Sequence, residues 1–174
     1  ENQIVSYLWN FDDGTTSTDT NPSHTFQFTP GVPHKYVVTL TVTDDINQQS
    51  IDSILISINN TPPQVNITSI IDSSLYHITG PTYYDLIASV ADVEHNDSLL
   101  TYEWQSVLHH NNHLHPEPKD NDHITSTVIN PDGCDDVFKW EINLKVTDPE
   151  GLWSSDTVFV YPKCQLPDLD FTSN

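Results

Sequence analysis

Histidines gather in one short stretch of this 174-residue chain. Five of the nine fall between positions 107 and 137, namely His109, His110, His113, His115 and His123. His113 and His115 are two residues apart, so in an extended strand their side chains point to the same side. Imidazoles with a nearby carboxylate suit Zn²⁺ or Cu²⁺. We therefore expect a zinc or copper site at His109, His113, His115 and Glu117. The alternative is a stiff structural loop or a glycan-contacting surface without a metal, because the spacing matches no strong zinc motif.

Carboxylates form two further clusters in the second half of the chain. One cluster precedes the segment that carries Trp104, and the other follows a long alternating segment; the members are Asp92, Glu94, Asp97, Asp148 and Glu150. Both turns can meet at one end of a β-sandwich, where hard carboxylate oxygens suit Ca²⁺. The alternative is a solvated acidic rim. A thinner acidic turn, Asp44-Asp45, takes the equivalent place in the first half.

Exposed aromatic side chains are the third candidate for chemistry. Trp153 follows Gly151 in a predicted turn, and its counterpart in the first half is the polar Gln49. An exposed indole can stack on the face of a sugar ring, so we expect a ligand-binding surface whose candidates are Trp153, Tyr83, Tyr84 and His110. Local packing of Trp153 is the alternative.

A repeated phrase indicates the elements that position these residues. Tyr-x-Trp, followed by aromatic-x-[Val/Ile]-x-Leu-x-Val-x-Asp, occurs at 7–9 and 36–44 and again at 102–104 and 140–148. A repeat of this length predicts two copies of one small fold. Trp9 and Trp104 take the position that packs across the core of an immunoglobulin-like sandwich.

Alternation of apolar and polar residues, broken by short turns, dominates both copies. Ile54, Ile56 and Ile58 share one face, and the segment 86–90 alternates in the same way. No stretch has helical spacing, so we expect an all-β chain of two tandem antiparallel β-sandwiches. The expected boundaries are 1–60, 61–165 and a tail or linker at 166–174, with a proline-stiffened connection at 59–63. Residues 107–137 hold an insertion, because 104–148 spans 44 residues where 9–44 spans 35.

Charge and motif content exclude several functions. The 25 acidic and 5 basic residues give a formal net charge of −20. Duplex nucleic acid and anionic membranes are therefore not expected partners, because both require basic side chains. No apolar run of about 20 residues predicts membrane insertion. We also expect residues upstream of Glu1, because the chain opens almost directly on the strand of Trp9. No nucleophile elbow, zinc-protease motif or phosphate loop is present, so the chain is not expected to be an enzyme.

Cys134 and Cys164 lie just outside two predicted neighbouring strands. The start of one antiparallel strand lies beside the end of the next, which brings the two cysteines together. We expect a disulfide, and with it an oxidising compartment; two free thiols are the alternative.

The first copy resembles the PKD domain family. The segments that carry the resemblance are Tyr7-Leu8-Trp9-Asn10-Phe11-Asp12-Asp13-Gly14, Asn21-Pro22-Ser23-His24-Thr25-Phe26 and the phrase at 36–44. The copy departs from the family at Asn10 and Asp12, where Asp and Gly are usual. The second copy looks like a diverged relative. Its His-rich segment 109–118 is similar to one in domains appended to large secreted bacterial proteins, including polysaccharide-degrading ones.

The resemblance implies an immunoglobulin-like sandwich and a noncatalytic role. We expect a tandem module of a large secreted or cell-surface bacterial protein, acting as a spacer and as a carbohydrate-binding or adhesion segment. The implied partners are a polysaccharide or neighbouring domains of the same chain. The alternatives are a purely structural stalk or filament repeat, and a metal-binding accessory to a secreted redox enzyme.

Overall fold

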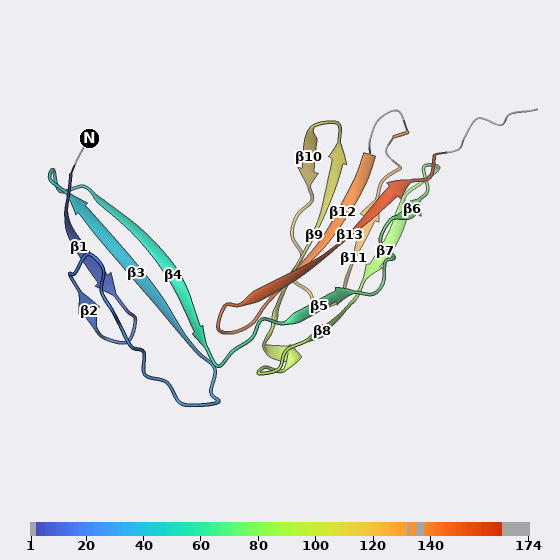
Figure 1. Cartoon of the computed structure of the whole chain (residues 1–174). Coiled ribbons are helices and arrows are strands. Elements are labelled where there is room, and N and C mark those ends of the chain that lie inside the picture. Colours follow the sequence, from blue (N-terminus) through green and yellow to red (C-terminus); the bar gives the residue numbers. More distant parts are fainter. Residues whose placement is uncertain (1–2, 132, 135–137, 165–174) are drawn as a thin grey trace, which may run out of the picture.

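The computed structural model describes residues 3–131, 133–134 and 138–164, and the expected tail at 166–174 lies outside them. Figure 1 shows two arms that diverge from the linker at 59–63. We define the first arm as residues 3–58 and the second arm as residues 64–164. The described residues form strands, turns and one short 3₁₀ helix, Asp97–Leu99. Among them, no helix is long and apolar enough to cross a bilayer.

The first arm is one antiparallel sheet in the order β2-β1-β3-β4. The strands are β1 (Ile4–Asn10), β2 (Thr16–Ser17), β3 (His34–Asp44) and β4 (Gln49–Ile58). Alternation along the central strand places Tyr36 and Val38 on one face, where both are buried. Trp9 of β1 pairs with Leu40 of β3 and shares this face.

The segment between β2 and β3 covers part of that face without forming a strand. The Phe26 ring stacks on Tyr36 at 4.6 Å between centroids, and His24 stacks on Phe11 at 3.9 Å. Trp9 is half-buried and donates from Nε1 to the Asp19 carbonyl. It also lines an open concavity of about 160 Å³ that reaches Ile54 of β4, so it does not lie in a closed core.

The second arm contains a sheet ordered β10-β9-β12-β13-β6 and two two-stranded sheets, β11-β7 and β5-β8. The bounds are β5 (Gln64–Ile67), β6 (Ser74–Tyr76), β7 (Thr82–Leu86), β8 (Ala88–Ala91), β9 (Thr101–His110), β10 (His113–Pro116), β11 (Thr125–Ile129), β12 (Phe138–Thr147) and β13 (Trp153–Pro162). One face of β12 is buried along its length, and that face supplies Trp140, Ile142, Leu144 and Val146. These side chains pack with Ile67, Leu86 and Ile129 of the smaller sheets, which makes the arm a two-layered sandwich.

Trp104 is 1 % exposed in this core, as the repeat predicts. The indoles of the two copies therefore differ in burial, because further strands cover the sheet of the second arm, whereas an irregular segment covers only part of the sheet in the described part of the first arm. The all-β, immunoglobulin-like fold class is confirmed.

The alternating segment 86–90 is not one strand. Leu86 ends β7 and Ala88 begins β8, and these strands belong to different sheets. Ile87 lies between them: its carbonyl accepts from the Thr68 and Ser69 amides, and its amide donates to Ser69 Oγ. The chain changes sheets here while the backbone groups of Ile87 keep partners.

A disulfide joins Cys134 and Cys164, whose Cα atoms are 5.7 Å apart. The expected pairing is confirmed. It ties the segment before β12 to the second residue after the end of β13, across a sequence separation of 30 residues.

The turn after β1 depends on one carboxylate. Asp13 Oδ1 accepts from the Thr15 hydroxyl at 2.6 Å and the Thr15 amide at 3.0 Å, and Asp13 Oδ2 lies 2.7 Å from His24 Nε2. The Thr15 hydroxyl is the largest cause of a lowered pKa at Asp13, and His24 adds to it. Gly14, at φ 87°, supplies the left-handed conformation that this turn needs.

Thr15→Val should raise the pKa of Asp13 toward its ordinary value of 3.8, because the strongest hydrogen bond to the carboxylate is lost. A lowered folded-state pKa stabilises the fold above the unfolded pKa, and this contribution disappears as pH falls through the folded value. The pH dependence of the Asp13 carboxyl ¹³C shift measures the change. Thr16→Val is the matched control, and an unchanged Asp13 titration in Thr15→Val contradicts the assignment.

Candidate metal centre at the linker

Asp92 follows β8 and organises its own turn. Its Oδ1 accepts from the amides of Glu94 at 3.0 Å and His95 at 2.7 Å, and from His95 Nδ1 at 2.9 Å. The side chain is 0 % exposed, and Asp92 Oδ2 has no hydrogen-bond partner among the described residues. A buried carboxylate oxygen without a partner is costly and requires an explanation.

Asp148 follows β12 and caps the second acidic turn. Its Oδ1 accepts from the Leu152 amide at 2.9 Å, and its Oδ2 accepts from Asn60 Nδ2 of the linker at 2.8 Å. Asp44 does the same in the first arm, where its Oδ1 accepts from the amides of Ile46 and Gln48. The aspartate that ends each repeated phrase is therefore a turn cap.

His95 lies between carboxylates of both turns. Its Nδ1 faces Asp92, and its Nε2 lies 2.6 Å from Glu150 Oε2. The second contact is an ion pair without hydrogen-bond geometry, so Glu150 Oε2 also lacks a hydrogen-bond partner among the described residues.

Three of these groups could hold one cation. Ligand atoms of Asp92, His95 and Asp148 all lie within 4.8 Å of one another. Asn60 Oδ1, which is also buried without a hydrogen-bond partner, belongs to the residue that binds Asp148. Carboxylate and amide oxygens suit Ca²⁺, while an imidazole also suits Zn²⁺. The donor set therefore fits a divalent cation.

The remaining calcium candidates have other partners. Glu94 Oε2 accepts from the Thr61 amide at 3.1 Å and the Thr61 hydroxyl at 2.8 Å. Asp97 accepts from the Tyr102 hydroxyl and lies 3.6 Å from His123 Nε2. Burial, followed by this contact with Asp97, raises the pKa of Tyr102. Glu94 thus binds the linker, and Asp97 stands apart from the cluster.

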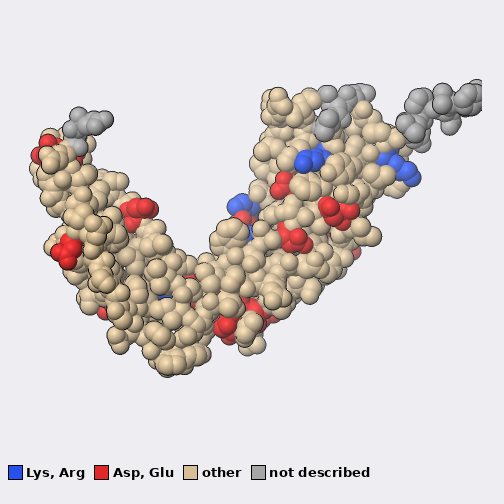
Figure 2. All heavy atoms as spheres, in the orientation of Figure 1, with Lys and Arg blue, Asp and Glu red and all other residues tan. Residues whose placement is uncertain are grey.

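The first arm also touches the second acidic turn. Lys35 Nζ of β3 donates to the Pro149 carbonyl at 2.7 Å. Gly151 packs so close to Leu55 of β4 that an added Cβ would lie 3.1 Å from Leu55 Cδ2. Figure 2 shows acidic atoms at the base of the second arm beside the linker. The cluster therefore lies where the two arms meet.

The predicted zinc or copper residues do not converge as a set of four. His113 and His115 lie on β10, whereas His109 on β9 lies 2.8 Å from Glu141 of β12. Glu117 follows β10, and its amide donates to the Ser106 carbonyl. His110, which was not in the predicted set, contacts the pair: its Nε2 lies 2.8 Å from His115 Nε2.

The aromatic candidates are also separated. Trp153 begins β13 rather than lying in a turn, and Lys145 Nζ lies 4.9 Å from its ring centroid. Tyr83 and Tyr84 lie on β7, in a different sheet. Tyr83 is exposed, whereas burial raises the pKa of the half-buried Tyr84. These side chains do not form one binding platform.

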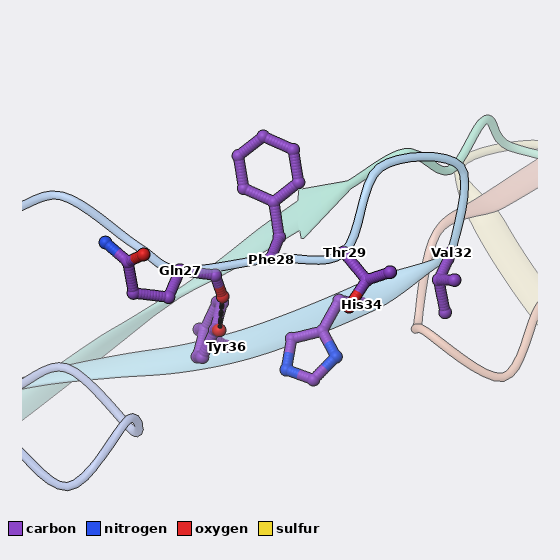
Figure 3. A pocket seen from close by; sticks show the side chains of 6 residues that line it. All are labelled: Gln27, Phe28, Thr29, Val32, His34 and Tyr36. Atoms are coloured by element: carbon purple, nitrogen blue, oxygen red, sulfur yellow. Dashed lines mark hydrogen bonds between the residues drawn. The ribbon is translucent and has the colours of Figure 1, made fainter.

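A concavity of about 290 Å³ lies in the first arm. Its lining comes from the segment before β3 and from β3 itself: Gln27, Phe28, Thr29, Val32, His34 and Tyr36. Figure 3 shows the Phe28 ring pointing to the opposite side of the chain from His34, and the Tyr36 hydroxyl bonded to the Gln27 carbonyl. The cavity is broad and open, and its lining brings no group of catalytic side chains together.

Comparison with known proteins bears on the first arm most directly. Residues 1–57 match the model of the PKD domain family. Collagenase ColA of Bacillus cereus is 40 % identical over 60 residues, and collagenase ColQ1 of Bacillus cereus strain Q1 is 29 % identical over 127 residues. The first arm thus matches the PKD domain family, as the sequence resemblance implied. Because the second match is longer than the first arm, it extends into the second.

These matches cover 34 % and 63 % of this chain, but 6 % and 12 % of the two collagenases. The chain therefore spans a small part of the length of these relatives. Among solved structures, the fibronectin(III)-like modules of Clostridium thermocellum CbhA match 94 % of this chain and 80 % of that one, at 12 % identity and a TM-score of 0.41.

Sequence reasoning missed His95 and Asn60. His95 stands among the acidic residues of the first turn, and this was an available signal. Asn60 gives no such signal, because its contact with Asp148 depends on the path that the linker takes in the folded chain.

Glu94→Ala should speed hydrogen exchange of the Thr61 amide roughly tenfold or more, because a hydrogen bond to a carboxylate contributes about 1.5–3 kcal/mol. Exchange followed by NMR measures the effect. Glu103→Ala is the matched control, since Glu103 pairs with Lys119 on the surface of the second arm. Equal Thr61 exchange in both variants contradicts a role for Glu94 in ordering the linker.

Proposed function

We propose that this chain is a noncatalytic spacer from a secreted bacterial protein, and that a divalent cation at the linker fixes the angle between its arms. The arms act as separate domains, at 1–60 and 61–165. The spacer presents neighbouring domains of the same chain to their target. Ca²⁺ is the leading cation, because oxygen atoms form most of the donor set.

The observation that carries this proposal is the meeting of the linker with both acidic turns at one end of the second arm. Asn60 binds Asp148 and Thr61 binds Glu94, so consecutive linker residues contact different turns. Carboxylates brought this close repel one another unless a positive charge lies among them. A cation bound to Asp92 and Asp148 supplies that charge and a partner for the unpaired Asp92 oxygen.

The setting in a larger protein is supported by the relatives. Both are collagenases, and the matched segments form a small fraction of each. The disulfide supports export to an oxidising compartment. We infer that the spacer accompanies a catalytic domain of an exported protein and contributes no catalytic residue.

Calcium should raise the melting temperature of the chelator-treated protein. A ligand at a hundredfold excess over its Kd stabilises the folded state by about 2.7 kcal/mol. Asp92→Asn should abolish the calcium-dependent shift, whereas Asp85→Asn, an exposed change on β7, should keep it. Scanning calorimetry with and without Ca²⁺ measures this, and parallel scans with Zn²⁺ test the contribution of His95. If neither Ca²⁺ nor Zn²⁺ shifts the melting temperature of the wild type, the proposed cation site is contradicted.

An exposed indole favours a second candidate function, adhesion to a polysaccharide. Trp153 is 56 % exposed, and Lys145 lies against its ring. An indole held in this way can stack on a sugar ring while the ammonium donates to its hydroxyls. This function is compatible with the spacer.

Trp153→Ala should remove retardation of the protein in affinity gels that contain plant or marine polysaccharides. Tyr83→Ala is the matched control, because Tyr83 is 75 % exposed but lies on a different sheet. If the wild type migrates equally in gels with and without each polysaccharide, adhesion is contradicted and the spacer is the one proposed function that remains.

A further inference from the structure

The hairpin of β9 and β10 gathers three histidines on one side. Asn111, at φ 50°, allows a two-residue turn between His110 and His113. In the resulting register His113 lies opposite His110, and His115 lies opposite Leu108. Side chains directly opposite each other, and those two residues along a strand, share a face. His110, His113 and His115 therefore share one face of the hairpin.

Two of these imidazoles are already in contact. The Nε2 atoms of His110 and His115 are 2.8 Å apart, and the ring planes differ by 5°. The His113 ring lies 5.8 Å from His110 between centroids. On the opposite side, Phe138 of β12 stacks on His110 at 5.4 Å. Phe138 thus restricts the His110 ring, and the two nitrogens approach each other from neighbouring strands.

The nitrogen spacing bears on which class of metal fits the pair. Two imidazole nitrogens bound at about 2.0 Å to one ion lie about 2.8 Å apart at a right angle and about 3.3 Å apart at a tetrahedral angle. The 2.8 Å separation fits the right angle at a tetragonal ion such as Cu²⁺ or Ni²⁺, whereas tetrahedral Zn²⁺ requires the two nitrogens to move apart by about 0.5 Å. Without a metal, one ring donates an N–H to the other, which holds both nitrogens at the same place.

We propose that His110 and His115 chelate Cu²⁺ through their Nε2 atoms, with His113 as the third ligand. The site differs from the sequence expectation, because His109 and Glu117 are excluded and His110 takes their place. It is also separate from the linker cluster: Figure 1 shows the hairpin tip at the end of the second arm away from the linker. His113 and His115 are exposed, so the ion can enter directly and keep open positions for a ligand from outside the chain.

Position and charge both favour the site. The formal net charge of −20 attracts cations to the whole molecule. Imidazole is among the preferred ligands of Cu²⁺, which binds a given nitrogen site more tightly than the other divalent first-row ions do. His109 lies on the opposite face of β9, where its Nε2 contacts Glu141. His109 is therefore a suitable control position.

Copper titration followed by calorimetry and electron paramagnetic resonance tests the proposal. We expect one saturable equivalent of Cu²⁺ with a tetragonal spectrum and hyperfine coupling to imidazole nitrogen. His110→Gln with His115→Gln should abolish this spectrum, whereas His109→Gln should keep it. Ni²⁺ should compete for the site, and Zn²⁺ should compete more weakly.

The linker cluster is a second place where copper can bind. Asp92→Asn eliminates that binding, so the titrations are repeated in this background. Circular dichroism checks that each variant keeps its fold. The same spectrum and stoichiometry in the His110 and His115 double variant would overturn the proposal, as would wild-type protein with no nitrogen-coordinated copper. Loss of the spectrum in His109→Gln would overturn the assigned ligands.

Discussion

The hydrogen bond from Asn60 to the buried Asp148 carboxylate is the constraint on which the arrangement of the two arms depends. Asp148 is already fixed, because its other oxygen caps the turn between β12 and β13. A linker residue bound to such a carboxylate is positioned by the core strand that carries it. Glu94 holds the next linker residue, Thr61, from the other acidic turn. Bonds to charged groups contribute about 1.5–3 kcal/mol each, which is enough to order a short linker.

The two copies of the repeated phrase have different surroundings in the two arms. Asp44 and Asp148 cap equivalent turns, and Asp148 also accepts a hydrogen bond from Asn60 of the linker. Trp104 is enclosed by the smaller sheets of its sandwich, whereas Trp9 lies over an open concavity. The second arm is therefore the closed structural body, and it carries the linker cluster at its base and the histidine hairpin at its tip.

Local patterns predicted the strands well and the sites less well. The repeated phrase identified the strands β1, β3, β9 and β12, because alternation is a local property of each strand. The cysteines followed from the ends of neighbouring strands. The proposed copper ligands of the hairpin could not be predicted in this way. The length of the turn sets the register, and a slip of one residue moves every side chain to the other face. That register places His110, and not His109, on the face of His115, where their Nε2 atoms are 2.8 Å apart.

The distance between spin labels at Ser50→Cys on β4 and Ser126→Cys on β11 tests the central claim most directly. The native cysteines are paired in a disulfide, so the two introduced thiols carry the labels. A fixed linker predicts one narrow distance distribution in pulsed electron resonance, which broadens when Asn60→Ala and Glu94→Ala are combined. A broad distribution in the parent protein, or a narrow one that survives both changes, would contradict the account.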